Sequence, residues 1–243
     1  MTAVREGLVW RSLADVPPDW PGCVVTIGVF DGVHRGHAHL IAAARSVAGT
    51  RPVVLVTFDP HPASVLGLPR DTSALSTVDR RAELGHSLGV EAILVLPFTR
   101  RFAALSPWEF VSGVLVDGLH AEAVVVGSNF TFGHRGAGTV ATLRELGLEA
   151  YGIDLVDGCS STRVRELVRL GDVSAASAVL GRPHRIEGVL TDGVLAVLPG
   201  TAVPPDGQYV GLLDGRLARV IVSGSVLVEG PDGPAAVEFV DRL

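Results

Sequence analysis

Short apolar runs rich in Val, Ile and Leu alternate with amphipathic helical stretches through most of this 243-residue chain. Such alternation is typical of βα units, which build a parallel sheet with helices on both faces. The runs lack polar alternation, so each expected strand is covered on both faces. We expect strands at 23–30, 52–58, 92–98, 121–127 and 148–156, and helices at 37–48, 78–88, 107–119 and 139–146. The predicted fold class is therefore α/β, a doubly wound parallel sheet.

The sequence pattern changes towards the carboxyl end. A helical period over 161–180, broken at Gly171-Asp172, is followed by Arg182-Pro183. From residue 189 onwards, short β-branched runs are separated by Asp-Gly and Pro-Gly pairs, a pattern typical of a small antiparallel meander. We therefore expect two domains, a larger α/β domain over 1–185 and a small antiparallel β domain over 186–243.

Composition and net charge limit the kinds of binding partner that this chain can have. The net charge of −6 disfavours nonspecific binding of nucleic acid through phosphate neutralisation. The longest apolar runs are strand-sized and the first residues lack the layout of a signal peptide, so we expect no membrane span and a cytoplasmic location. Cys23 and Cys159 have no C-x-x-C spacing, and no other histidine or cysteine pattern predicts a protein-held metal. The expected partner is a small molecule.

A loop rich in glycine and histidine, Gly-Val-Phe-Asp-Gly-Val-His-Arg-Gly-His over 28–37, links the first expected strand to the first helix. Backbone amides and the helix dipole can bind phosphate at such a place, and glycine permits close backbone approach. His34 and His37 are three residues apart, so both imidazoles can face one triphosphate. The loop lacks the Walker G-K-[ST] ending and the dinucleotide G-x-G-x-x-G pattern, which disfavours a P-loop that transfers a γ-phosphoryl group.

A second polar element, Ser-Ser-Thr-Arg-Val-Arg over 160–165, opens a helix. Hydroxyls and amides there can bind β- and γ-phosphates, and the Arg165 guanidinium, one turn into the helix, suits a departing pyrophosphate. Taken alone, the element is better explained as a helix cap followed by a solvated arginine.

Residues that follow two other strands are candidates for an acceptor pocket. The stretch Phe-Asp-Pro-His-Pro over 58–62 ends the second expected strand, so its ring and prolines can form a pocket wall, although a simple turn also explains the prolines. Asn129 and Phe130 follow the fourth strand, where Phe130 either packs in the core or stacks on a ligand ring. Arg80 and Arg81 are interpreted as part of a solvated helix face.

The loop over 28–37 resembles the GxFDGxHxGH signature of the FAD synthetase module in bacterial bifunctional riboflavin kinase/FAD synthetases. Further stretches resemble that module's other motifs, in order, at 56–62, 104–110, 126–133 and 160–165. The resemblance covers roughly residues 20–190.

This resemblance implies a Rossmann-like nucleotidyltransferase fold, in which the phosphate of FMN attacks the α-phosphorus of ATP to give FAD and pyrophosphate. ATP is the implied donor, Mg²⁺ the implied metal and FMN the implied acceptor. The implied catalytic residues are His34, His37 and Arg165. The implied nucleotide-binding residues are Gly28, Phe30, Asp31, Gly32, Gly36, Ser161 and Thr162. The residues implied to bind the acceptor or flavin are Phe58, Pro60, His61, Asn129 and Phe130.

The chain also departs from that family. A riboflavin kinase domain follows there, with a GFPTANL-like stretch that binds nucleotide, whereas here the stretch is missing and only about 55 residues remain. We therefore expect no kinase activity and interpret the tail as a remnant of a kinase barrel. Such a remnant stabilises the enzyme, caps it, allows self-association or contacts the acceptor. The segment 154–159 is shorter than the family's usual connection and lies where it can alter the choice of acceptor.

Several alternatives stay open at this point. The donor is ATP or CTP, and the acceptor is FMN or a different phosphorylated small metabolite. In a third interpretation the chain is a catalytically idle regulator that binds flavin or nucleotide.

Overall fold

The computed structural model describes residues 7–243, which form two compact units. The first unit contains the described residues up to Phe30 together with Gly36–Arg70 and Val78–Val156. The second contains Asp31–Arg35, Asp71–Thr77 and Asp157–Leu243. Residues 1–6 of the predicted 1–185 domain lie outside the described residues. The division predicted at residue 185 stays a prediction.

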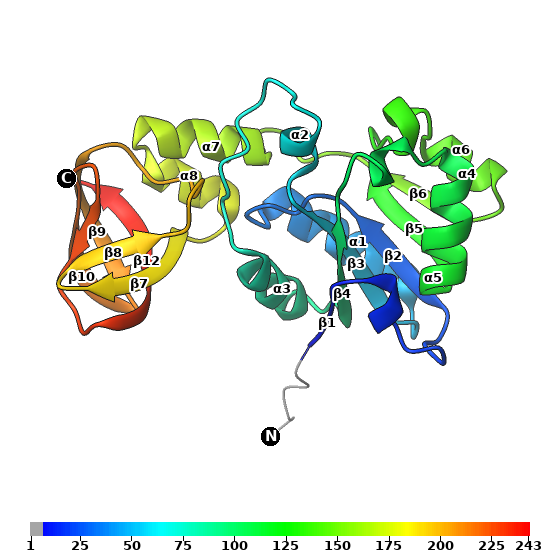
Figure 1. Ribbon diagram of the computed structural model, residues 1–243, viewed down its shortest axis with the longest axis horizontal. Coiled ribbons are helices and arrows are strands. Elements are labelled where there is room, and N and C mark those ends of the chain that lie inside the picture. Colours follow the sequence, from blue (N-terminus) through cyan, green and yellow to red (C-terminus); the bar gives the residue numbers. More distant parts are fainter. Residues whose placement is uncertain (1–6) are drawn as a thin grey trace. The chain divides into compact units, whose positions relative to one another are not determined.

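A six-stranded parallel sheet forms the centre of the first unit (Figure 1). Its strands are β1 (Leu8–Trp10), β2 (Cys23–Ile27), β3 (Val53–Asp59), β4 (Ala92–Pro97), β5 (Ala121–Gly127) and β6 (Glu149–Ile153). Neighbouring strands are parallel throughout, in the order β1-β4-β3-β2-β5-β6. The predicted parallel sheet is confirmed. The sequence pattern did not indicate β1, because this edge strand has only three residues and two of them are exposed.

Buried aliphatic side chains cover both faces of this sheet. On one face, Val54 and Leu94 share a core cluster with Leu115 from the helical segment that precedes β5. On the other face the helix α3 (Val78–Ser87) packs so closely that a Cβ added at Gly85 would lie 2.8 Å from Ile93 Cδ1. All five residues of β2 are buried, which explains the missing polar alternation.

Helices follow the strands in the predicted alternation. The α-helices are α1 (Arg35–Ala48), α2 (Pro62–Val65), α3 (Val78–Ser87), α4 (Pro107–Glu109), α5 (Asp117–Leu119) and α6 (Val140–Glu145). A π-helical segment, Phe110–Val116, joins α4 to α5, and 3-10 turns lie at Leu13–Asp15, Phe102–Ala104 and His134–Gly136. Ser106 caps α4 in a capping box with Glu109, so the helix begins where the serine and proline predict.

The second unit contains a closed barrel of six antiparallel strands (Figure 1). They are β7 (His184–Thr191), β8 (Val194–Val197), β9 (Gly207–Leu213), β10 (Arg216–Val222), β11 (Val226–Val228) and β12 (Gly233–Arg242). The predicted Asp-Gly turn at Asp192 and Gly193 joins β7 to β8, with φ of 49° and 77°, as in a type I′ turn. The predicted antiparallel strands are confirmed. The strands form a closed barrel because β12 pairs with both β7 and β9.

Two helices of the second unit, α7 (Ser161–Leu170) and α8 (Val173–Leu180), precede the barrel. Gly171 ends α7 with a φ of 78°, at the predicted break in the helical period. Val173 of α8 packs in the barrel core with Tyr209 and Phe239, so the barrel has a continuous apolar interior. Throughout the described part of the chain, no helix is long and apolar enough to cross a membrane.

Candidate active site

The loop that leaves β2 has a strained backbone. β2 has β3 on one side and β5 on the other, so the strand order reverses around it, and ligands of such sheets bind beyond the carboxyl ends of the strands at this point. Along the loop, φ is 52° at Phe30, 76° at Gly32 and 38° at Val33. Positive φ at bulky residues persists only where surrounding contacts hold it. The predicted phosphate-binding loop over 28–37, called the phosphate loop below, therefore has a constrained conformation.

Phe30 shapes the start of this loop within the first unit. Its buried ring lies 4.9 Å from the His37 ring, centroid to centroid. A Cβ added at Gly28 would lie 3.2 Å from Cε2 of that ring, so glycine at this position allows the ring to fold back over the strand end. Phe30 thus packs in the interior beside His37, with its ring turned away from solvent. The predicted residue Gly36 enters α1 one position before His37.

Asp31 anchors the next part of the loop within the second unit. Its carboxylate accepts hydrogen bonds from the backbone N–H groups of Leu75 and Ser76, at 3.1 Å, and from the Ser76 hydroxyl, at 3.2 Å. The same hydroxyl accepts a hydrogen bond from the backbone N–H of Gly32 at 3.0 Å. Since the Asp31 side chain is buried and bonded to protein donors, it fixes the shape of the loop.

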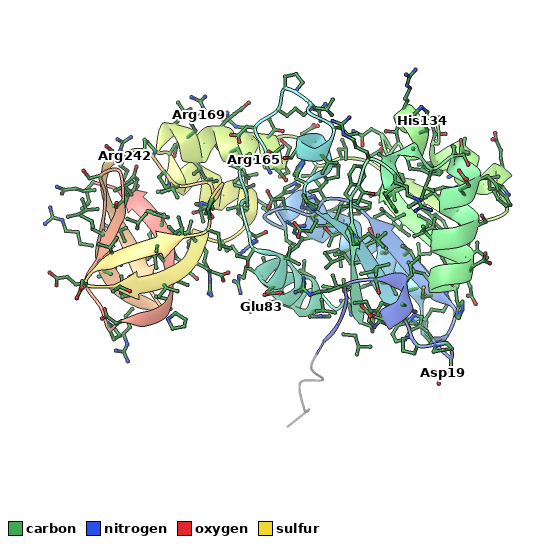
Figure 2. All side chains as sticks on the ribbon, in the orientation of Figure 1. Asp19, Glu83, His134, Arg165, Arg169 and Arg242 are labelled. Carbon is green, nitrogen blue, oxygen red and sulfur yellow. The ribbon has the colours of Figure 1, made fainter. Side chains whose placement is uncertain are left out.

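The start of α7 contacts the same loop. The Ser161 hydroxyl donates to the backbone carbonyl of Asp31 at 2.9 Å, and Arg165 Nη2 lies 2.5 Å from Asp31 Oδ2. Arg165 Nε also donates to the carbonyl of Ser73 at 2.7 Å. Arg165 is buried, in contrast to Thr162, whose side chain is exposed at the helix start. Figure 2 labels Arg165 on α7. The alternative in which Arg165 is a solvated surface charge is therefore wrong.

His34 lies buried in this loop, next to a cation that the sequence analysis did not propose. Arg182 donates from Nη1 to the carbonyl of Val33 at 2.9 Å and from Nη2 to the carbonyl of Gly32. Burial and the Arg182 charge lower the pKa of His34 to about 4, against an opposite effect of Asp31. The His34 imidazole is therefore neutral at pH 7, with one N–H donor and one acceptor nitrogen.

A cavity of about 1020 Å³ opens in the first unit beyond the carboxyl ends of four strands. Gly28 and Val29 enter it from β2, Phe58 from β3, Phe98 from β4 and Asn129 from β5. Six phenylalanines line it, namely Phe58, Phe98, Phe102, Phe110, Phe130 and Phe132. Exposed cationic or ionisable side chains also line it, namely Arg70, Arg100, His134 and Arg135. The cavity thus combines aromatic walls with a cationic rim.

The predicted acceptor residues fall into two groups. Phe58, Asn129 and Phe130 line the cavity, and the Phe58 and Phe98 rings meet edge to face at 5.5 Å. Pro60 and His61 are not among the lining residues, and His61 Nδ1 instead accepts a hydrogen bond from the backbone N–H of Ala63 at the start of α2. Phe98 was missed, although it directly follows β4, just as Phe58 lies near the end of β3.

Arg81 was interpreted from the sequence as solvated, and this is wrong. Its side chain is buried, and Nη1 donates to Thr57 Oγ1 at 2.9 Å and to the Phe58 carbonyl at 3.3 Å. Thr57 Oγ1 in turn donates to the carbonyl of Val29 at 2.7 Å. An arginine tolerates this burial because its donors meet oxygens along β3. Helical periodicity alone does not reveal such a contact.

Metal-ligating side chains do not cluster among residues 7–243: no group of three or more His, Cys, Asp or Glu there could hold a metal ion.

A parallel α/β sheet whose strand order reverses at β2, with a constrained loop leaving that strand, is typical of the class of nucleotide-binding proteins. Residues 16–164 match the family model described as FAD synthetase. The chain belongs to the FAD synthetase family, which is a family of nucleotidyltransferase enzymes.

Curated relatives carry a longer chain. A bifunctional riboflavin kinase/FMN adenylyltransferase of Pseudomonas fluorescens is 37% identical over 75% of this chain and 62% of its own length. The protein of the same name from Listeria monocytogenes is 34% identical over 70% of this chain and 57% of its own length. The matches thus span about three-fifths of these relatives.

A solved structure shares the fold. It is described as a macrolide-efflux protein from Streptococcus pneumoniae and aligns with a TM-score of 0.85 at 24% identity, over 98% of this chain and 90% of that one.

Proposed function

We propose that the protein is an FMN adenylyltransferase that transfers the AMP group of ATP to the phosphate of FMN, giving FAD and pyrophosphate. The observation that carries the proposal is the aromatic cavity into which Gly28 and Val29 project, because these two residues open the loop that we assign to the nucleotide. Membership of the FAD synthetase family supports the same reaction.

The donor nucleotide is assigned to the loop and to the start of α7. We propose that imidazole N–H groups of His34 and His37 donate to phosphate oxygens of ATP. Ser161 and Thr162 contribute hydroxyls at the amino end of α7, where the helix dipole favours anions. Arg165 adds a permanent charge for the leaving pyrophosphate, and its buried pairing with Asp31 orients it. Asp31, Gly32 and Gly36 act by shaping the backbone around the phosphates.

The chemical step is a direct displacement. An oxygen of the FMN phosphate forms a bond to the α-phosphorus of ATP, and the bond from that phosphorus to the bridging β-oxygen breaks. The electron pair leaves with pyrophosphate, and no covalent enzyme intermediate forms. Side-chain and backbone donors stabilise the charge that grows on the phosphates and align the attacking oxygen. Further charge neutralisation at the triphosphate would come from Mg²⁺ when it is bound with ATP.

The acceptor is assigned to the aromatic cavity. A planar flavin ring suits walls built from Phe58, Phe98 and Phe130, because aromatic rings prefer edge-to-face and offset-stacked neighbours. The cationic rim, which includes Arg100 and Arg135, suits a phosphorylated acceptor on a chain whose net charge is −6. Asn129 is assigned a polar contact with the acceptor.

We further propose that riboflavin kinase activity is absent. The barrel interior is filled by its own apolar side chains, including Leu190, Tyr209 and Phe239. We therefore assign the barrel a structural role and no kinase activity. We also propose that the barrel allows self-association. The boundary between the two domains at residue 185 is likewise a proposal.

Products identified by mass spectrometry test this assignment. Purified protein with Mg²⁺ is incubated with either ATP or CTP and with either FMN or riboflavin. FAD from ATP and FMN, with no FMN from ATP and riboflavin, is the expected result. Triphosphate binding without FAD formation would favour a different phosphorylated acceptor, and a lack of triphosphate binding would favour an idle regulator.

A further inference from the structure

Arg182 occupies the junction between α8 and the barrel. It follows Gly181, the left-handed residue that ends α8, and β7 begins two positions later at His184. His184 is buried and its Nε2 lies 2.7 Å from the carbonyl of Ala202, which holds the start of β7 in place. The junction that carries Arg182 is therefore fixed on both sides.

The Arg182 guanidinium spans successive carbonyls of the phosphate loop. Nη2 donates to the carbonyl of Gly32, while Nη1 donates to that of Val33 at 2.9 Å and to that of Leu180 at 3.2 Å. A planar guanidinium can reach two adjacent oxygens at once, which a lysine ammonium does less well. One side chain thus ties the loop to the end of α8.

The two loop residues held in this way have left-handed backbones. The φ of Val33 is 38°, a conformation that a β-branched residue adopts only under external constraint. Gly32 has a φ of 76°, and its backbone N–H is held by the Ser76 hydroxyl. His34 follows directly, so the backbone that Arg182 holds sets where the His34 ring points.

We propose that Arg182 is a positioning residue for nucleotidyl transfer, which holds the Gly32 and Val33 carbonyls and so presents His34 to the phosphates of the nucleotide. The inference rests on the proposed function of the loop. It deepens that function by giving the junction between α8 and the barrel a role in the reaction.

Turnover of Arg182→Ala and chemical rescue form the first test. The variant is expected to lose about 100-fold in kcat, the typical cost of a misplaced reacting group, with a smaller change in KM for ATP. Added ethylguanidinium is expected to restore part of the rate and ethylammonium is not, because only the planar cation reaches both carbonyls. Arg182→Lys, which keeps the charge, is expected to lie between wild type and Arg182→Ala. Arg185→Ala is the matched control, since Arg185 pairs with Glu187 on β7.

A readout that needs no turnover separates this inference from the proposed function. NMR titration of the His34 ring in Arg182→Ala is expected to give a higher pKa than in wild type, because a neighbouring positive charge is lost. A raised titration point in a protein that makes no FAD would support the positioning role and contradict the proposed function. The inference is overturned if kcat changes by less than about threefold, or if ethylammonium rescues as well as ethylguanidinium. An unmoved His34 titration also overturns it.

Discussion

Arg165 Nη2 lies 2.5 Å from Asp31 Oδ2, and both side chains are at most 5% exposed. The pair joins the helix start of α7 to the middle of the phosphate loop. Because four protein donor groups, from Leu75, Ser76 and Arg165, surround the Asp31 carboxylate, the protein's own contacts hold the loop in shape. Such preorganisation is what a charge-stabilising site requires.

Arg165→Ala is expected to lower the stability of the fold as well as the rate of the reaction. Removal of one partner of a buried pair leaves a buried charge, and we expect a loss of about 3 kcal/mol in the free energy of unfolding. Arg163→Ala is the control, because Arg163 pairs with Glu166 on the same helix at the surface, where the cost is below about 1 kcal/mol. Urea unfolding followed by circular dichroism measures both. Equal losses would contradict the anchoring role of the Asp31 pair.

Stability is expected to fall as the pH drops below neutrality. The folded-state pKa of His34 is about 4 against 6.5 for the ordinary group, so between these values the unfolded chain binds more protons. The stabilisation is present above pH 6.5 and is lost as the pH falls towards 4, by about 2 kcal/mol between pH 7 and pH 5.

Comparison of wild type with His34→Gln isolates this effect. Chemical denaturation at pH 7 and pH 5 is expected to show a smaller loss in the variant. Burial also lowers the pKa of His184, so part of the pH dependence should remain. A His34→Gln protein with the full wild-type pH dependence would show that His34 titrates normally in the fold.

His37→Ala is expected to reduce turnover by at least about 100-fold, as loss of one preorganised donor typically does. His39→Ala is the matched control, since His39 lies on the same helix with an exposed side chain. Steady-state FAD formation measures both variants, and their melting temperatures test the fold. A near-wild-type rate for His37→Ala would remove His37 from the mechanism.

Phe58→Leu is expected to raise KM for FMN by about fivefold and to leave KM for ATP nearly unchanged. The substitution keeps an apolar wall but removes a ring contact, whose typical worth is about 1 kcal/mol. Trp108→Leu is the control, because Trp108 is 64% exposed and outside the cavity lining. A selective rise in KM for ATP would instead assign the aromatic cavity to the nucleotide.

The sequence predicted those features that local patterns encode. Buried strands such as β2 lack polar alternation, capping residues such as Ser106 mark helix starts, and the Asp192-Gly193 pair marks a hairpin. The phosphate loop and the start of α7 were predicted as separate motifs, and the contact of Ser161 with Asp31 brings them together.

The features that the sequence did not reveal depend on contacts between distant residues. Closure of the barrel needs β12 to pair with β7 and β9, which no turn signal specifies. In the sequence, Arg81 looks like an ordinary helix-surface cation and Arg182 like an ordinary residue after a helix end. Only the fold places their donors on Thr57 and on the Val33 carbonyl. A residue that acts through another residue leaves no pattern of its own.

The most direct measurement follows isotopic label from ATP into the flavin product. The account predicts that the protein, given FMN and ATP labelled at the α-phosphorus, transfers the label into FAD, whereas label at the γ-phosphorus appears only in pyrophosphate. Label from the γ-phosphorus in a flavin product, or no α-label in FAD under conditions where ATP binds, would contradict the proposal that this protein is an FMN adenylyltransferase.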